Sequence, residues 1–296
     1  NLLLQWYVWV PIVSVLSYLT WRNYRTIDAL KDIDGVLLSI EIPRANDKKV
    51  EAAEQMFASL HGILRDRQEF RQSGGIQEYI SFEIAAIGKS IYFYVWVPKH
   101  LQNFVEGQIY AQYPSVQIRE SDEDYTKRHL EHPVAHSSEL VLIDNELLPI
   151  KTLHGSEGDS LLGITAALGK LENSSEEIWI QVIARPISDS WQQRANAYIN
   201  RIKNGGRGLG INFGEMGYLL KILEALWTPP SASPKSTMPH ELTERDKQRI
   251  AGIENKSTRL GYQVKIRAVY LGEDPASARL RMQEIIGTFR KFSSTN

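Results

Sequence analysis

The sequence predicts an α+β protein with an N-terminal transmembrane helix followed by two ferredoxin-like αβ modules, the second interrupted by an insertion. Three observations predict this organisation. An apolar segment without charged residues opens the chain. Runs of β-branched and aromatic residues then alternate with helical apolar spacing, in the order strand–helix–strand–strand–helix–strand. Part of that pattern returns in the second half of the 296-residue chain, which is long enough for about two domains.

Residues 2–21 (LLLQWYVWVPIVSVLSYLTW) form the predicted membrane segment, because they carry no charged side chain. A helix of this length spans about 30 Å, the thickness of the hydrocarbon core. Residues 22–35 are then a juxtamembrane linker, and the arginines at its start place the rest of a single-pass protein in the cytoplasm by the positive-inside rule. The residues expected at the two interfaces are aromatic or basic: Trp6, Trp9, Tyr18, Trp21, Arg22 and Arg25.

Two alternatives exist for this first segment. One is a buried helix of a soluble domain, and the other is a cleaved signal peptide. The signal peptide is disfavoured because no basic region is visible before the apolar run and no small-residue cleavage site follows it. The transmembrane helix is therefore the favoured interpretation.

Residues 36–120 are expected to form the first ferredoxin-like module. Short β-branched and aromatic runs predict its strands, and apolar residues at helical spacing predict its two helices. Gly88, Lys89 and Ser90 suggest a hairpin between the two central strands. The expected elements are a strand at Val36–Ile42, a helix from Val50 to Leu64, strands at Tyr79–Ile84 and Ile91–Val97, a helix from Leu101 to Tyr110, and a strand at Val116–Arg119.

A polar linker at residues 121–138 is expected to precede the second αβ module at residues 139–296. The stretch 205–242 is predicted to be an insertion, because it begins glycine-rich, continues proline-rich and separates two parts of the repeated pattern. The remaining expected elements are a strand at Ile178–Ala184, a helix from Trp191 to Ile202, a helix from about Thr243 to Leu260, a strand at Tyr262–Leu271 and a helix ending near Phe289.

The second module lacks a counterpart of the strand at Val116–Arg119. An open sheet edge is a pairing liability that folds normally cover. We therefore expect the missing strand, or a domain packed against that edge, beyond Asn296.

The residue types that carry chemistry do not indicate an active site. The chain has no cysteine, which excludes a disulfide framework, a thiol nucleophile, a Cys-ligated zinc and an iron–sulfur cluster. His129, His132 and His136 invite a metal interpretation, but Pro133 opposes the helix that would align them, and a polar linker is favoured. The glycines between 205 and 214 match no phosphate-loop motif and favour a loop. We therefore assign no catalytic, cofactor-binding or metal-binding residue, and expect this chain alone not to be an enzyme.

The charges are unevenly distributed along the chain. Residues 121–185 have a net charge of −7 and residues 186–296 a net charge of +7, within an overall charge of −1. The basic end is either a solvated or self-complementary surface or a surface for an anion. If it faces DNA, binding should be weak, non-specific and salt-dependent, with little base stacking. The candidates for DNA or subunit contacts lie on the last predicted helix: Arg279, Arg281, Arg290 and Lys291.

Several segments in a fixed order resemble a known family. They are Val36–Arg44, Glu51–Gly62, Tyr79–Glu83, Tyr92–Pro98, Gln108–Pro114 and Glu254–Tyr262. Together they resemble the N-terminal membrane-proximal region of bacterial type IV secretion coupling ATPases, the conjugative DNA-transfer family. The resemblance covers nearly the whole chain, including its apolar start.

The resemblance implies a non-catalytic region that anchors a DNA-translocating motor in the membrane, with secretion-channel proteins as partners. It further implies an ATPase domain with a phosphate-binding loop downstream, through which the protein would form a homo-oligomer. No catalytic residue carries over, because this chain contains no such loop motif. The alternative is a stand-alone membrane-bound scaffold or ligand-binding module without a motor, and the downstream coding sequence distinguishes the two.

Overall fold

The computed structural model of the chain describes residues 6–31, 33–43, 50–152, 161–171, 175–203 and 242–293. These residues form two compact units. The larger, which we call the sheet unit, is drawn from Asn1–Ile143, Ile150–Ser188 and Leu260–Thr295. The smaller, the helical unit, is drawn mainly from Asp144–Pro149 and Asp189–Arg259. The fold is α+β, with a seven-stranded antiparallel sheet.

The chain begins with a long helix, α1 (Trp6–Lys31). Every side chain from Trp9 to Arg25 is exposed. The hydroxyls of Ser14 and Thr20 donate to the backbone carbonyls four residues earlier, at 2.7 and 2.8 Å, so the helix satisfies its own polar groups. None of the described helices combines the length and apolar character of a membrane span, and residues 2–5 of the predicted segment lie outside the described residues.

The helix does not end where the membrane segment was expected to end. Residues 22–35 were predicted to be a linker, but α1 continues through most of them to Lys31. This part of the chain contains no proline or glycine before Gly35, so nothing in the backbone interrupts a helix that has already been nucleated.

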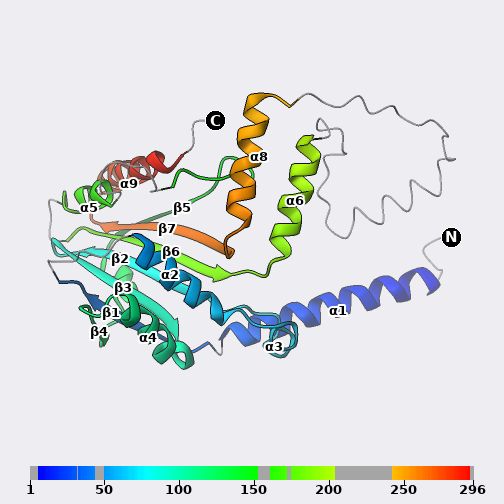
Figure 1. The fold of residues 1–296 in the computed structure, drawn as a ribbon. Helices are drawn as coiled ribbons and strands as arrows, with labels where there is room; N and C mark the ends of the chain where they lie inside the picture. The colour runs from blue at the N-terminus through cyan, green and yellow to red at the C-terminus, as the bar shows by residue number, and fades with distance from the viewer. Residues whose placement is uncertain are drawn as a thin grey trace. The chain divides into compact units, whose positions relative to one another are not determined.

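The first half of the sheet follows the expected order of elements (Figure 1). Strands β2 and β3 form the predicted hairpin, with both turn residues, Gly88 and Lys89, at positive φ, as two-residue hairpin turns require. The strands lie in the order β4-β1-β3-β2 and all neighbours are antiparallel. The elements are β1 (Gly35–Glu41), α2 (Val50–Leu60), η2 (His61–Ile63), α3 (Arg67–Gln72), β2 (Ile80–Ile87), β3 (Ser90–Pro98), η3 (Lys99–Leu101), α4 (Gln102–Gln112) and β4 (Gln117–Glu120).

The second half contains η4 (Tyr125–Glu131), β5 (Val134–Leu140), α5 (Leu162–Leu168), β6 (Glu177–Pro186), β7 (Tyr262–Gly272), α9 (Pro275–Phe289) and η5 (Arg290–Phe292), with α6 (Ser190–Lys203) and α8 (Glu244–Ser257) in the helical unit. The predicted helix at 243–260 is confirmed as α8, which Thr243 caps through a reciprocal bond with Asp246. The predicted insertion 205–242 lies outside the described residues except for Leu242.

One boundary prediction was wrong. The sequence placed residues 121–138 in a polar linker, whereas Val134–Leu140 forms strand β5 and pairs antiparallel with β7. The strand is mostly exposed and polar, so it lacks the apolar alternation by which strands are predicted. No described strand pairs with its outer edge.

The two halves are parts of one sheet, because β2 pairs antiparallel with β6 in the order β4-β1-β3-β2-β6-β7-β5. Strands β5 and β6 are each antiparallel to β7, which lies between them, and α5 connects them. This path repeats that of β1, α2 and β2 around β3. Strand β6 therefore corresponds to the second strand of the first half, and not to the first as its sequence position had suggested. In chain order, the helical unit comes between β6 and β7, where the first half has its hairpin turn.

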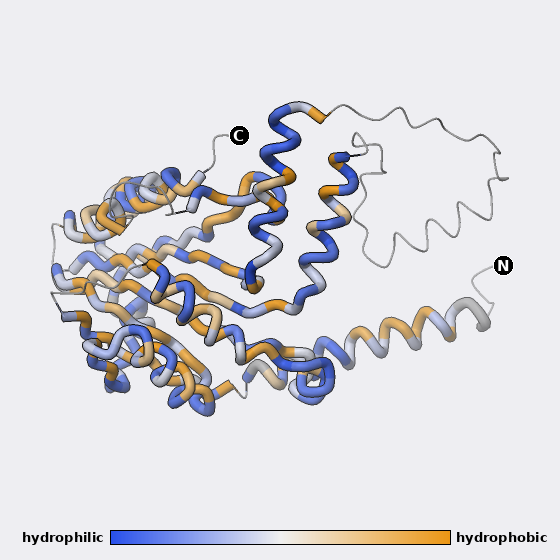
Figure 2. Tube along the Cα trace, viewed as in Figure 1, coloured by the Kyte–Doolittle hydropathy of each residue, from blue (hydrophilic) through white to orange (hydrophobic). Residues whose placement is uncertain are grey.

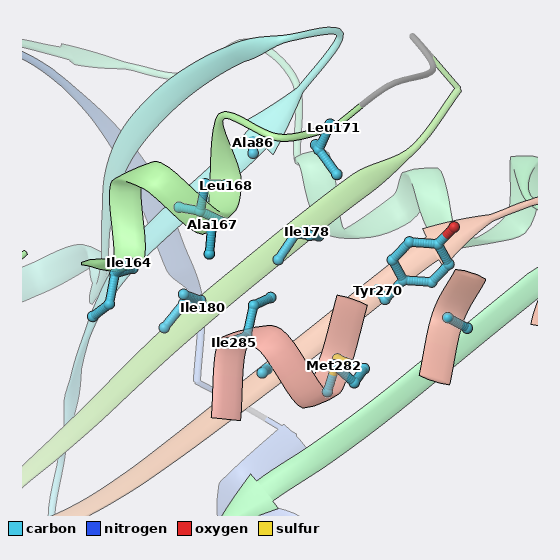
Figure 3. Close-up of a cluster of buried hydrophobic side chains, with 12 residues drawn as sticks. Ala86, Ile164, Ala167, Leu168, Leu171, Ile178, Ile180, Tyr270, Met282 and Ile285 are labelled. Atoms are coloured by element: carbon cyan, nitrogen blue, oxygen red, sulfur yellow. The ribbon is translucent and has the colours of Figure 1, made fainter. Parts of the chain in front are cut away.

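The side chains of β2 show that the helices share one face of the sheet. Ile80 and Phe82 pack in the apolar cluster with α2 and α4, and Ile84 and Ala86 pack in the cluster with α5 and α9. All four point to the same side, because side chains alternate along a strand. Figure 3 shows Ile164 and Leu168 of α5 and Met282 and Ile285 of α9 gathered over β6 and β7. Figure 2 shows hydrophobic and hydrophilic residues interspersed along these elements.

The opposite face is covered in part by η4. Tyr125 stacks on Tyr94 with ring centroids 5.0 Å apart and meets the edge of Trp179 at 4.9 Å. Its hydroxyl donates a short hydrogen bond to Glu83, and burial raises the pKa of the Glu83 carboxyl above its usual value. Nearby, the buried Glu177 accepts a hydrogen bond of 2.7 Å from Arg128. Two buried carboxylates therefore fasten η4 to one end of this face.

We expect Gly35→Ala to destabilise the sheet unit and Gly107→Ala to stabilise it. A Cβ at Gly35 would overlap the indole of Trp96, and such overpacking costs about 1–3 kcal/mol. A Cβ at Gly107, within α4, would meet no atom within 4 Å, and alanine gains up to about 1 kcal/mol over glycine in a helix. Urea unfolding followed by circular dichroism measures both; equal shifts in midpoint would contradict the assigned packing of Trp96.

Candidate functional site

Two adjoining cavities lie in the sheet unit at the base of α1. Their volumes are about 390 and 650 Å³. They share the side chains of Arg65, Gln72, Ser73, Glu78 and His100. The larger is lined in addition by Arg25, Asp28 and Ala29 of α1, so it lies where the N-terminal helix meets the αβ fold.

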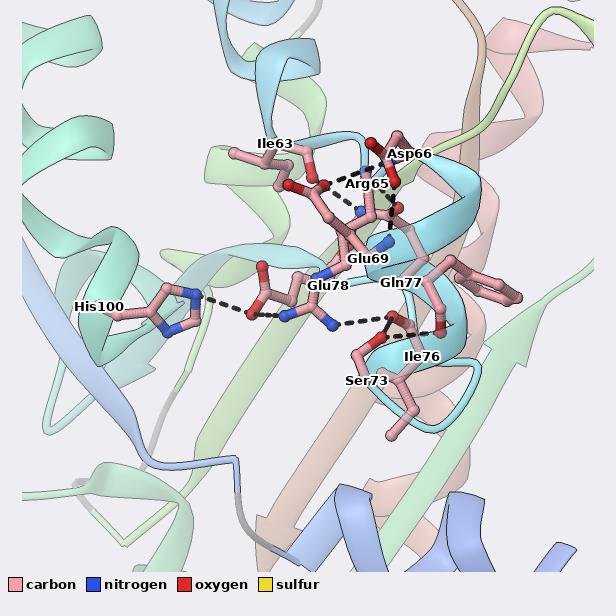
Figure 4. A network of polar contacts seen from close by, with 10 residues as sticks. Ile63, Arg65, Asp66, Glu69, Ser73, Ile76, Gln77, Glu78 and His100 are labelled. Atoms are coloured by element: carbon pink, nitrogen blue, oxygen red, sulfur yellow. Dashed lines mark hydrogen bonds and ion pairs between the residues drawn. The ribbon is translucent and has the colours of Figure 1, made fainter. Parts of the chain in front are cut away.

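The centre of this site is the carboxylate of Glu78, just before β2. The residue is only 6% exposed, yet its Oε1 lies 2.7 Å from Arg65 and 2.8 Å from Nε2 of His100 (Figure 4). A buried carboxylate needs such partners, because desolvation is costly for an isolated charge. The three side chains come from three separate segments and fix them to one another.

Local hydrogen bonds hold the loops that carry these side chains. The guanidinium of Arg65 donates to Ile76 O at 2.9 Å, and Gln77 accepts from the Arg65 backbone N–H and donates to Ile63 O. Asp66 caps α3 in a reciprocal bond with Glu69, the capping box. Arg65 therefore approaches Glu78 from a backbone that is fixed on both sides (Figure 4).

Gly74 attaches α1 to this site. The hydroxyl of Thr26 donates to Gly74 O at 2.9 Å. Gly74 has φ +73°, and a Cβ there would lie 3.1 Å from Cβ of Ala29 and 3.2 Å from Arg25 O. Only glycine combines a left-handed backbone with so close an approach. The contact holds the last turns of α1 against the loop between α3 and β2.

The site holds several charged side chains in fixed positions, which suits it to binding. The larger cavity is lined by the cations Arg25, Arg65 and Lys99 and by the carboxylates Asp28, Asp34 and Glu78, with His100 at its edge. Opposed charges of this kind suit a small zwitterionic or polar ligand. They also suit a joint between α1 and the fold, because Glu78 is paired with Arg65 and His100, and Nζ of Lys99 lies 3.8 Å from Asp34.

The three histidines that invited a metal interpretation have three different environments. Nε2 of His132 lies 3.5 Å from Glu177, whereas Nδ1 of His129 contacts Thr126 O at 2.7 Å. His136 lies exposed on β5. Within the part of the chain that the structure describes, no group of three metal-ligating side chains comes together. The glycines at 205–214 lie outside the described residues.

The predicted membrane-anchor residues all lie on α1. Trp9, Tyr18 and Trp21 are 43%, 56% and 54% exposed. The guanidinium of Arg25 lies 5.3 Å from the centre of the Trp21 ring, a cation–π distance, and Arg22 is exposed. The side chain of Trp6 lies outside the described residues.

The predicted basic contacts on the last helix do not act as a group. Arg279, Arg290 and Lys291 are exposed. Arg281 is only 8% exposed and lies 3.8 Å from Glu176 and 3.3 Å from Glu284. Because the guanidinium of Arg281 is buried and paired with these carboxylates, it is unsuited to a DNA contact. The sequence missed this because Glu176 is far from Arg281 along the chain.

Sequence reasoning also missed Arg65, Glu78 and His100. They stand in no motif, and a charged residue is most often exposed. The available signal was weak. Glu78 lies two residues before β2 and His100 two residues after β3, and hairpin pairing brings these two strand ends together.

Comparison with known proteins places the chain in a family. It belongs to the family described as a domain of unknown function, DUF8128, which matches residues 25–296. No curated protein matches it. Among solved structures, it is similar to aclacinomycin oxidoreductase at 8% identity with a TM-score of 0.36. That match covers 87% of this chain and 41% of the other, so the chain spans less than half of that protein.

We expect Gly74→Ala to destabilise the sheet unit more than Gly88→Ala does. Both glycines have positive φ, at +73° and +56°, so both substitutions carry the left-handed penalty of about 1–2 kcal/mol. Only the Cβ at position 74 meets α1; that at 88 meets no atom within 4 Å. Thermal unfolding measures the difference, and equal losses would contradict the joint between α1 and the loop.

We expect Arg281→Met to lower the unfolding free energy by about 3–5 kcal/mol, because it leaves the buried Glu176 without its cation. Arg279→Met, two residues away on the exposed side, should change it by less than about 0.5 kcal/mol. Urea unfolding of both variants tests this. If Arg281→Met changed the unfolding free energy only slightly, Arg281 would again be a candidate for a DNA or subunit contact.

Proposed function

We propose that the chain is the non-catalytic, membrane-anchored region of a type IV secretion or conjugation DNA-translocating ATPase, which positions and oligomerises the motor at the membrane. The anchor and the fold are argued from the structure of this chain. The motor, the secretion-channel partners and the homo-oligomer rest on the sequence resemblance alone.

The observation that carries the proposal is the exposure of α1. Its side chains from Trp9 to Arg25 are all exposed, and they include large apolar residues around the whole helix. Large apolar side chains that lie exposed along successive turns of a helix favour an apolar environment. Lipid around the turns up to Trp21, with Arg22 and Arg25 at the headgroups, supplies that environment.

The contacts at the C-terminal end of α1 attach the proposed anchor firmly to the αβ fold. The contact of Thr26 with Gly74 and the charges around Glu78 brace its last turns against the αβ fold. We propose that this fold consists of two ferredoxin-like modules joined edge to edge, the second with the helical unit in place of a hairpin. A braced helix holds such a domain at a fixed distance from the membrane, as a motor at a channel requires.

A stand-alone membrane-bound ligand-binding module is the second candidate. The cavity of about 650 Å³ at the base of α1 favours it, because its volume lies within the range of small-molecule sites. The downstream coding sequence distinguishes the candidates: a phosphate-loop motif supports the motor, and a stop codon or a long extension without one supports the module.

We expect the full chain to fractionate with membranes and to resist carbonate extraction, and a chain starting at Asp34 to be soluble. Val13→Arg together with Leu16→Arg should release the full chain, since each charge at mid-helix costs about 2.5–3.5 kcal/mol on insertion. Tyr24→Arg is the matched control, because it adds the same exposed charge to α1 beyond Arg22. Unchanged membrane association of the double variant, or of the chain starting at Asp34, would count against the anchor.

A further inference from the structure

The face of the sheet opposite α2, α4, α5 and α9 brings together residues from both halves of the chain. Ser81 of β2 lies opposite Trp96 of β3 on one side and opposite Ile183 of β6 on the other. Ile183 in turn lies opposite Lys265 of β7. Residues directly opposite each other point to the same face, so Trp96 and Lys265 share one row, about 14 Å apart at three strand spacings.

Aromatic side chains gather at one side of this row. The rings of Tyr79 and Trp96 stack with centroids 4.9 Å apart and planes within 18°. Both side chains are half-buried, and Tyr92, on the same strand and face as Trp96, is 42% exposed. Burial, chiefly, raises the pKa of the Tyr79 phenol, so the ring is neutral at physiological pH. Flat, neutral rings on an open sheet are platforms on which unpaired bases stack.

Basic side chains gather at the other side. Arg185, Lys265 and Arg267 on β6 and β7 are all exposed. Arg267 lies in the next row of the same face, opposite Gln181, which lies opposite Glu83. Burial and the charge of Glu83 raise the pKa of Tyr79, and the charge of Arg267 lowers it, so both charges are within electrostatic reach of the ring. Lys265 lies 3.0 Å from Glu139, with both side chains nearly half exposed. A surface pair of this kind is weak, and a phosphate can replace the carboxylate.

The rest of this face is unsuited to an anion. η4 covers part of it, and the stretch leading into η4 contains Asp122, Glu123 and Asp124. The buried carboxylates of Glu83 and Glu177 also lie there. An anionic ligand is therefore confined to the end that holds Tyr79, Trp96, Arg185, Lys265 and Arg267, which we call the aromatic–basic patch.

We propose that the aromatic–basic patch binds single-stranded nucleic acid, with unpaired bases on Tyr79 and Trp96 and phosphates on Arg185, Lys265 and Arg267. The inference rests on the proposed role beside transported DNA and deepens it by naming the contact surface. It replaces the basic residues of α9 as the contact surface, since Arg281 is buried and ion-paired. It also adds base stacking, which the sequence of the basic third alone did not suggest. A duplex, with its bases already stacked, gains only the phosphate contacts.

The test is fluorescence anisotropy of the full chain in detergent with a labelled oligothymidine, at several salt concentrations. Lys265→Glu combined with Arg267→Glu should weaken binding at least tenfold and reduce the dependence of log affinity on log salt by about two phosphate contacts. Tyr79→Leu should weaken binding about tenfold and leave the salt dependence unchanged, because stacking releases no counterion. Arg279→Glu on α9 is the matched control and should change affinity less than twofold.

Three results would overturn the proposal. One is a loss with Arg279→Glu as large as that with the double variant, which would assign the contact to α9. Another is an equal affinity for duplex and single strand that Tyr79→Leu leaves unchanged. The third is the absence of oligonucleotide binding at low salt, including the case in which the patch binds anionic lipid vesicles instead. None of these affects carbonate-resistant membrane association, so failure of this inference and failure of the anchor are distinguishable. Thermal unfolding of each variant confirms that the fold is retained.

Discussion

The pairing of β2 with β6 is the constraint on which the rest of the sheet unit depends. Eight residue pairs, from Ile80 with Ala184 to Ile87 with Glu177, join the two halves of the chain into one seven-stranded sheet. Because side chains alternate along a strand, this register decides which residues of both halves share a face. A slip of one residue would turn β6, and with it the second half, to the wrong side.

One consequence is that the two faces of the sheet have different characters. The face with α2, α4, α5 and α9 holds the two large apolar clusters. The other face holds a smaller cluster of aromatic residues, buried carboxylates under η4, and exposed charges on β6 and β7. Antiparallel sheets commonly bury one face and leave the other to solvent or a partner. The second face is therefore where this fold can carry an interaction without loss of its core.

A second consequence concerns the ends of the strands. Glu78, which leads into β2, and His100, which follows β3, meet at one end of the sheet, and Arg65 reaches them from the loop before α3. Gly74, against which α1 is held, lies in the next loop, between α3 and β2. The polar site and the attachment of α1 therefore lie in the same part of the fold. There the buried carboxylate of Glu78 ties together several short segments.

Local pattern in the sequence determined many of the helices and most strands, because apolar spacing and turn residues act over a few positions. It did not predict α3, α5 or the continuation of α1 to Lys31. The hairpin at Gly88 and Lys89 and the helix after Thr243 followed from such signals. The strand Val134–Leu140 did not, because an exposed edge strand has little apolar alternation. Only the tertiary structure decided that β2 pairs with β6, that Arg281 is buried beside Glu176, and that Tyr79 and Trp96 share a face with Arg267. These facts depend on contacts between residues far apart in the chain, for which the local sequence carries no periodic signal.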